Sequence, residues 1–151
     1  MSNSYVESVG SRLERLVQAF QNMAPTSRLK LLSSYASKLP PLPERYQGHG
    51  FFQDEDCKTP FYIALEQHQN IHLFFDAPKD ALLIWAFGGM LYELIEDASR
   101  EEVLALSPDF YKALGLEALL SEMRLRTLGV MLMKVKVELK KLPAPTLEVN
   151  T

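Results

Sequence analysis

The chain has 151 residues, of which 47% are hydrophobic and 23% charged, values typical of one globular domain with a proper core. Its net charge of -3 includes no dominant basic block, which argues against a general nucleic-acid binder. The single cysteine, Cys57, excludes an internal disulfide and argues against a structural zinc cluster.

Two features predict a cytoplasmic protein. A lone cysteine is typical of a reducing compartment. The longest apolar-rich run, residues 81–95, carries Glu93 and is too short to span a bilayer, and we expect no signal peptide. We therefore expect neither a membrane nor nucleic acid among the partners.

Helices are expected at the start of the chain. From about Ser8, apolar residues recur at spacings of three and four up to Phe20, which predicts a first helix. The segment APTS then interrupts it, and Thr26 or Ser27 is expected to cap a second helix that continues to about Tyr35. The phrase KLPPLPERYQGHG follows, and its closely spaced prolines exclude both helix and central strand.

Residues 60–76 show the period of β-strands. The alternating apolar residues are Phe61, Ile63 and Leu65, then Ile71, Leu73 and Phe75 after a QHQN turn. We therefore predict an antiparallel hairpin whose apolar side needs a layer of helices to cover it. A hairpin also has an outer edge, which either accepts an extended peptide or is covered by the protein's own elements.

The rest of the chain is expected to be helical. Residues 78–97 are apolar nearly all round, which predicts the most buried helix, with Gly88 and Gly89 permitting close packing or a kink. Ser99 and Glu102 form a capping-box pattern at the start of the next helix.

Two more helices complete the expected order. Ser107 as a cap and Gly115 as a stop predict a short helix. A last helix is predicted from Ser121 to about Leu142. Its methionines are expected to fill gaps in the core, and they are Met123, Met131 and Met133.

This order of elements predicts an α+β fold in which a small antiparallel sheet, the hairpin over residues 60–76, is flanked by helices. We expect a single domain over residues 8–142. Residues 1–7 and 143–151 are expected to be flexible ends.

Several phrases carry a resemblance to a known family. YASKLPPLPERYQ is followed by a lone cysteine, a hairpin, a long apolar helix and then LSPDFYKALGLEALLSEMRLRTLGVML. Over roughly residues 12–142, this arrangement resembles the SufE family. The resemblance implies an α+β fold and a protein that accepts persulfide sulfur from a PLP-dependent cysteine desulfurase for iron–sulfur cluster assembly. It also implies that Cys57 is the sulfur acceptor and that Arg124 assists it.

The residues around Cys57 depart from the family pattern, which is a hydrophobic residue, any residue, Gly-Cys and then Ser. Here Asp54 takes the hydrophobic position, Asp56 the glycine and Thr59 the serine. A persulfide acceptor attacks as a thiolate. Carboxylates at Asp54, Glu55 and Asp56 are expected to raise the thiol pKa by about one unit and slow such an attack.

Two functional hypotheses follow from this departure. The one we favour on sequence grounds is a SufE-like binding module, an assembly factor, chaperone or adaptor for a cytosolic complex, with sulfur transfer lost or secondary. The alternative is a working sulfur acceptor on Cys57. The candidate partner-binding residues are Asp54, Glu55, Asp56, Phe61 and Tyr62.

Neither hypothesis requires a bound group. His68 and His72 flank the hairpin turn without a third ligand at a suitable spacing, so we expect solvated or strand-face histidines rather than a metal site. We expect no cofactor. The expected partner is another protein, either a client segment of an assembling complex or the desulfurase.

Overall fold

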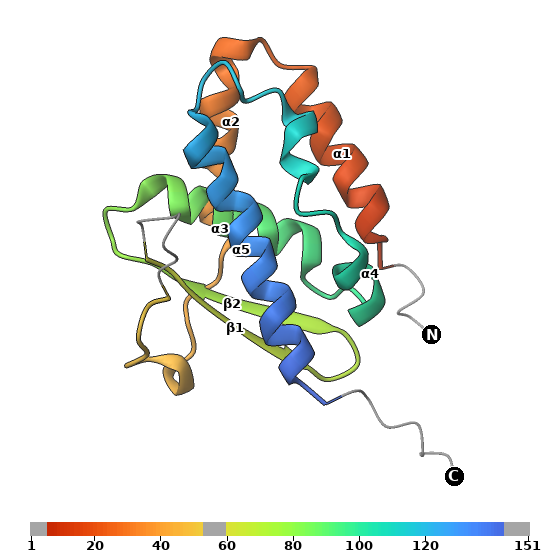
Figure 1. Ribbon diagram of the computed structural model, residues 1–151, viewed down its shortest axis with the longest axis vertical. Helices are drawn as coiled ribbons and strands as arrows, with labels where there is room; N and C mark the ends of the chain where they lie inside the picture. The colour runs from red at the N-terminus through yellow and green to blue at the C-terminus, as the bar shows by residue number, and fades with distance from the viewer. Residues whose placement is uncertain (1–5, 53–59, 144–151) are drawn as a thin grey trace.

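The computed structural model describes residues 6–52 and 60–143. Within them lie five α-helices and two strands, in the order helix, helix, hairpin and three helices (Figure 1). The elements are α1 (Val9–Gln21), α2 (Arg28–Ser34), β1 (Tyr62–Gln67), β2 (Ile71–Asp76), α3 (Leu82–Ile95), α4 (Arg100–Ala105) and α5 (Glu122–Lys141). The α+β class predicted from the sequence is confirmed.

The two strands pair antiparallel, with Tyr62 opposite Asp76 and Gln67 opposite Ile71. The alternating residues that predicted the hairpin are all buried on one face of it. Helix α5 lies across this face and contacts β1, while α3 contacts β2 (Figure 1). The helical cover expected for the apolar side is therefore supplied by α3 and α5.

Helix α3 is the centre of the core, as its uniformly apolar sequence predicted. Most of its residues are buried, among them Phe87, Met90 and Leu91. A side chain at Gly88 would run into the ring of Phe75, and one at Gly89 would overlap the backbone carbonyl of Tyr35. The two glycines therefore let α3 approach the sheet on one side and the end of α2 on the other.

Helix α1 is fastened by two polar contacts between distant parts of the chain. Arg12 is only 8% exposed and donates hydrogen bonds to the carbonyls of Leu94 and Glu96 at the end of α3, at 3.1 and 2.6 Å. Glu102 completes the predicted capping box with Ser99 and also accepts from the backbone N–H of Val9, at 3.0 Å.

Three local predictions need correction. Ser27 is the N-cap residue of α2, one of the two candidates, but its side chain makes no capping hydrogen bond, because a 3-10 turn at Pro25–Ser27 leads directly into the helix. The segment after Ser107 forms a 3-10 helix, Phe110–Leu114, although Gly115 ends it in the left-handed conformation. Met131 is buried as predicted, whereas Met123 and Met133 are exposed.

Among the described residues, no helix combines the length and the apolar composition needed to cross a membrane. Residues 1–5 and 144–151, which make up most of the two expected flexible ends, lie outside the described residues.

Candidate functional site

The segment that carries the candidate cysteine lies outside the described residues. Cys57 and its neighbours Asp54, Glu55 and Asp56 all belong to residues 53–59. Both ends of this segment are described, however, and they lie side by side. Phe52 and Phe61 form an antiparallel bridge with two backbone hydrogen bonds, of 2.6 and 2.9 Å. The chain between them therefore begins and ends at one place, at the start of β1.

The upstream end is held by His49. Its Nε2 lies 2.7 Å from the carboxylate of Asp76 on β2, and its ring stacks on Tyr62 with 3.9 Å between centroids. The ring of Phe51 meets His49 edge-on at 4.9 Å. The His49 side chain is only 10% exposed, so these contacts are shielded from water. His49 therefore anchors the chain three residues before Phe52, the last described residue ahead of the segment.

Two residues of the candidate partner-binding set are described. Tyr62 is half-buried beneath His49. Phe61 is fully buried and its ring packs 5.4 Å from that of Phe52, which differs from the surface role expected for it. Phe61 therefore contributes its side chain to the core and its backbone to the bridge.

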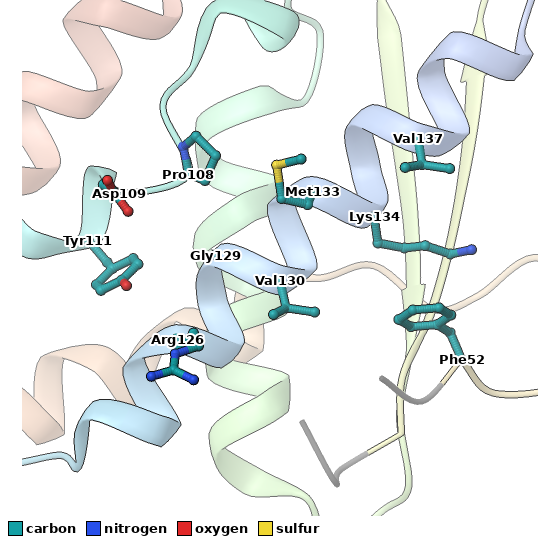
Figure 2. Close-up of a pocket in the computed structure, with 10 residues that line it drawn as sticks. All are labelled: Phe52, Pro108, Asp109, Tyr111, Arg126, Gly129, Val130, Met133, Lys134 and Val137. Carbon is teal, nitrogen blue, oxygen red and sulfur yellow. The ribbon is translucent and has the colours of Figure 1, made fainter. Parts of the chain in front are cut away.

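One wall of the site is formed by α5. Lys134 lies beside Phe52 (Figure 2), with its ammonium 4.5 Å from the centroid of the Phe52 ring, a cation–π contact. The same ammonium pairs with Glu138 at 2.9 Å. Burial disfavours the charged form of Glu138, but hydrogen bonds from Lys134 and Lys141 outweigh it and lower the pKa of this carboxyl. Lys134 thus places a positive charge beside the start of the cysteine segment.

An apolar groove of about 380 Å³ extends from Phe52 along α5 towards Pro108 and Tyr111 (Figure 2). The exposed side chains of Met133 and Val137 line it, each 46% accessible. Arg126 supplies a charge at its far end.

Arg124, the predicted assisting residue, is not among the residues that line this groove. It lies in the first turn of α5, where its backbone N–H donates to the Ser121 side chain, and its own side chain is exposed. Three residues of the site, Arg126, Lys134 and Phe52, were not predicted from the sequence. Helical spacing was a usable signal for α5, since Arg126, Val130, Lys134 and Val137 recur at intervals of three and four.

The two hairpin histidines both contact carboxylates. His68 lies 3.1 Å from Glu66, and His72 lies 2.9 Å from Glu96 and 3.7 Å from Asp97. The donor atoms of His72, Glu96 and Asp97 come within 4.8 Å of one another. Both oxygens of Glu96 are already engaged, one by His72 and one by the backbone N–H of Leu73. The group therefore fastens the end of α3 to β2.

Comparison with models of known protein families identifies the family of this chain. A family model described as SufE: Fe-S metabolism associated domain matches residues 14–139. The chain belongs to the SufE family. The matched range includes Phe52 and Phe61 on either side of the cysteine segment, the hairpin and nearly all of α5.

Relatives of known sequence agree with the SufE assignment. An uncharacterized SufE-like protein of Mycobacterium tuberculosis, found in two strains, is 29% identical over 135 residues, which are 88% of this chain and 94% of the relative. The chloroplastic/mitochondrial SufE-like protein 1 of Arabidopsis thaliana is 24% identical over 120 residues, 79% of this chain but 32% of the plant protein.

A solved structure agrees as well. The solution structure of a hypothetical protein from Thermus thermophilus superposes with a TM-score of 0.74 and 31% identity. The match covers 86% of this chain and 94% of that one. The SufE fold predicted from the sequence is therefore confirmed.

Proposed function

We propose that this protein is a sulfur acceptor, which takes persulfide sulfur from a PLP-dependent cysteine desulfurase on Cys57 and passes it towards iron–sulfur cluster assembly. The observation that carries the proposal is the match of residues 14–139 to a family associated with Fe-S metabolism, a range that includes Cys57. This is the alternative of the two sequence-based hypotheses. None of the relatives above has a name that describes an assembly factor or a chaperone.

The proposed step is a thiol–persulfide exchange. The Cys57 thiolate attacks the terminal sulfur of a persulfide on the desulfurase. A new S–S bond forms on Cys57 while the S–S bond of the donor breaks, and the donor cysteine leaves as a thiolate that takes up the proton lost by Cys57. Each side of the reaction contains one persulfide and one free cysteine thiolate, so the exchange needs no outside oxidant or reductant.

The surroundings of the cysteine segment support this proposal in two ways. The bridge between Phe52 and Phe61 joins the two described residues that flank the segment containing Cys57. Lys134, held over Phe52, supplies a positive charge that opposes the field of Asp54, Glu55 and Asp56 and so favours the thiolate.

The PLP belongs to the desulfurase, and no step of the exchange requires a cofactor on this chain. A cytoplasmic location fits the proposal, because a reducing compartment keeps a lone acceptor thiol available.

The test is desulfurase turnover with and without this protein, with persulfide on Cys57 followed by mass spectrometry. We expect the wild type to stimulate turnover and to acquire the persulfide, and Cys57→Ser to do neither. Asp56→Gly restores the family residue beside the cysteine and should stimulate at least as well as the wild type. A wild-type protein that binds the desulfurase without stimulating it or accepting sulfur would return the assembly-factor hypothesis to first place.

A further inference from the structure

Within residues 6–52 and 60–143, part of the outer edge of β1 has no hydrogen-bonded neighbour. In an antiparallel pair, alternate residues direct their backbone N–H and C=O groups away from the partner strand. Phe61 does so, because both of its groups bond to Phe52. Ile63 and Leu65 follow at intervals of two and therefore direct their groups the same way. No hydrogen bond from the described residues reaches these groups.

The outer edge of β2 differs in this respect. Ile71 exchanges backbone hydrogen bonds with Ala98 and Asp97, of 2.9 and 2.8 Å, and the N–H of Leu73 donates to Glu96 at 2.8 Å. The chain after α3 thus covers the edge of β2. Such cover is the usual way in which proteins prevent unwanted strand pairing. Among the described residues, none covers Ile63 and Leu65 in this way, and this difference between the two edges needs an explanation.

The chain that could have covered the β1 edge turns away from it. After pairing at Phe52, continuation of the strand register would bring Gly50 opposite Ile63. Instead, His49 lies over the outer face of the sheet, where Asp76 and Tyr62 hold it, and Gly48 permits the turn with a φ of +78°.

A groove remains along the open edge. It has a volume of about 530 Å³ and runs past Ile63 to Leu65, between Gly50 and Phe52 on one side and α5 on the other. Lys134 and Glu138 form the α5 wall and pair with each other at 2.9 Å. The β1 edge adds the backbone donors and acceptors of Ile63 and Leu65 to the groove.

We infer that an extended segment of the cysteine desulfurase binds in this groove as an added strand, paired with the backbone of Ile63 and Leu65. An extended peptide is the ligand whose spacing of N–H and C=O groups matches a strand edge. The desulfurase is the occupant because Phe52, on the rim of the groove, directly precedes the segment that carries Cys57, to which the donor must deliver its sulfur. This inference rests on the proposed function.

The test combines amide hydrogen exchange with a variant that fills the groove. In the free protein, the amides of Ile63 and Leu65 should exchange at least about tenfold faster than that of Ala64, which faces β2. Addition of the desulfurase should slow both to the rate of Ala64.

Gly50→Trp should weaken desulfurase binding about tenfold, because a large side chain then occupies the groove. Gly10→Trp is the matched control on α1. An added Cβ meets no atom within 4 Å at either glycine, so neither variant should disturb the fold.

The outcomes separate the inference from the proposed function. If the desulfurase binds and transfers sulfur while the Ile63 and Leu65 amides stay fast and Gly50→Trp behaves like Gly10→Trp, the added strand is wrong and sulfur transfer stands. If these amides are already slow in the free protein, the chain itself covers the edge and the inference is overturned. If the desulfurase neither binds nor transfers sulfur, the proposed function fails and this occupant with it.

Discussion

The ammonium of Lys134 lies 4.5 Å from the centroid of the Phe52 ring, and this contact joins the middle of α5 to the last described residue before the cysteine segment. Phe52 in turn pairs through its backbone with Phe61 at the start of β1. Helix α5, which packs on β1, therefore also carries a cation beside the last described residue before the segment that contains Cys57.

Lys134→Met should slow the alkylation of Cys57 by iodoacetamide near neutral pH roughly two- to threefold. Removing the cation leaves the neighbouring carboxylates unopposed, so less of the thiol is ionised. Lys141→Met is the control, because Lys141 also contacts Glu138 but lies at the far end of α5. Equal rates for the two variants would show that Lys134 does not influence the thiol.

Neutralising the acidic residues before the cysteine should have the opposite effect. The triple variant Asp54→Asn, Glu55→Gln, Asp56→Asn should speed alkylation roughly threefold, because a larger thiolate fraction is partly offset by lower intrinsic nucleophilicity. The control is a second triple variant that neutralises the exposed Glu14, Glu101 and Glu117, and so has the same net charge as the first. If the triple variant also loses desulfurase stimulation, the acidic residues recruit the partner rather than repel it.

Glu66 should make stability depend on pH in the acid range. Its carboxylate accepts from the Tyr46 hydroxyl at 2.6 Å and from Arg45 at 2.7 Å. The Tyr46 bond is the largest influence, and together with Arg45 and His68 it outweighs burial and lowers the pKa of Glu66 from 4.5 to about 2. A carboxyl whose pKa is lower in the folded than in the unfolded state stabilises the fold when the pH is above its unfolded-state pKa. This stabilisation is lost as the pH falls towards its folded-state pKa.

We therefore expect Glu66→Gln to reduce the free energy of unfolding by about 1 kcal/mol at neutral pH, after allowance for solvent screening. The difference from the wild type should shrink between pH 4.5 and about 2, measured by urea denaturation at a series of pH values. Glu44→Gln, at an exposed site, is the matched control for loss of one carboxylate. A constant difference across this range would contradict the assignment.

Gly89→Ala should destabilise the protein by about 2 to 4 kcal/mol, because the added methyl overlaps the Tyr35 carbonyl and α3 would have to shift. Gly10→Ala in α1 meets no atom within 4 Å and should be neutral or stabilise by up to about 1 kcal/mol. Thermal unfolding of both variants gives the comparison. A similar small effect at both positions would mean that α3 does not need a glycine there.

Local sequence patterns were sufficient for much of the fold. The period of two at Ile63, Leu65, Leu73 and Phe75 predicted the hairpin, and the all-round apolar sequence of α3 predicted the most buried helix. These predictions succeed because the periodicity of a strand or helix decides which side chains share a face. The capping box of Ser99 with Glu102 depends on local spacing in the same way.

Predictions that depended on neighbours distant in the chain were less successful. The sequence around His49 is that of an ordinary loop, yet its side chain is 10% exposed because Asp76, 27 residues away, bonds it. The polar Arg12 is buried because carbonyls more than 80 residues away accept its N–H groups. Met133 is of a residue type common in hydrophobic cores, but it lies on the side of α5 that the sheet does not cover.

The sequence by itself determined the fold class, the family and the position of the single cysteine, because these follow from periodicity and from characteristic phrases. Only the tertiary structure decided which charge stands beside the cysteine segment and which strand edge stays open. Lys134 and Phe52 are 82 positions apart, and no local pattern relates them. Likewise, the contact of His49 with Asp76 directs the chain away from Ile63, so that no described residue pairs with the β1 edge there.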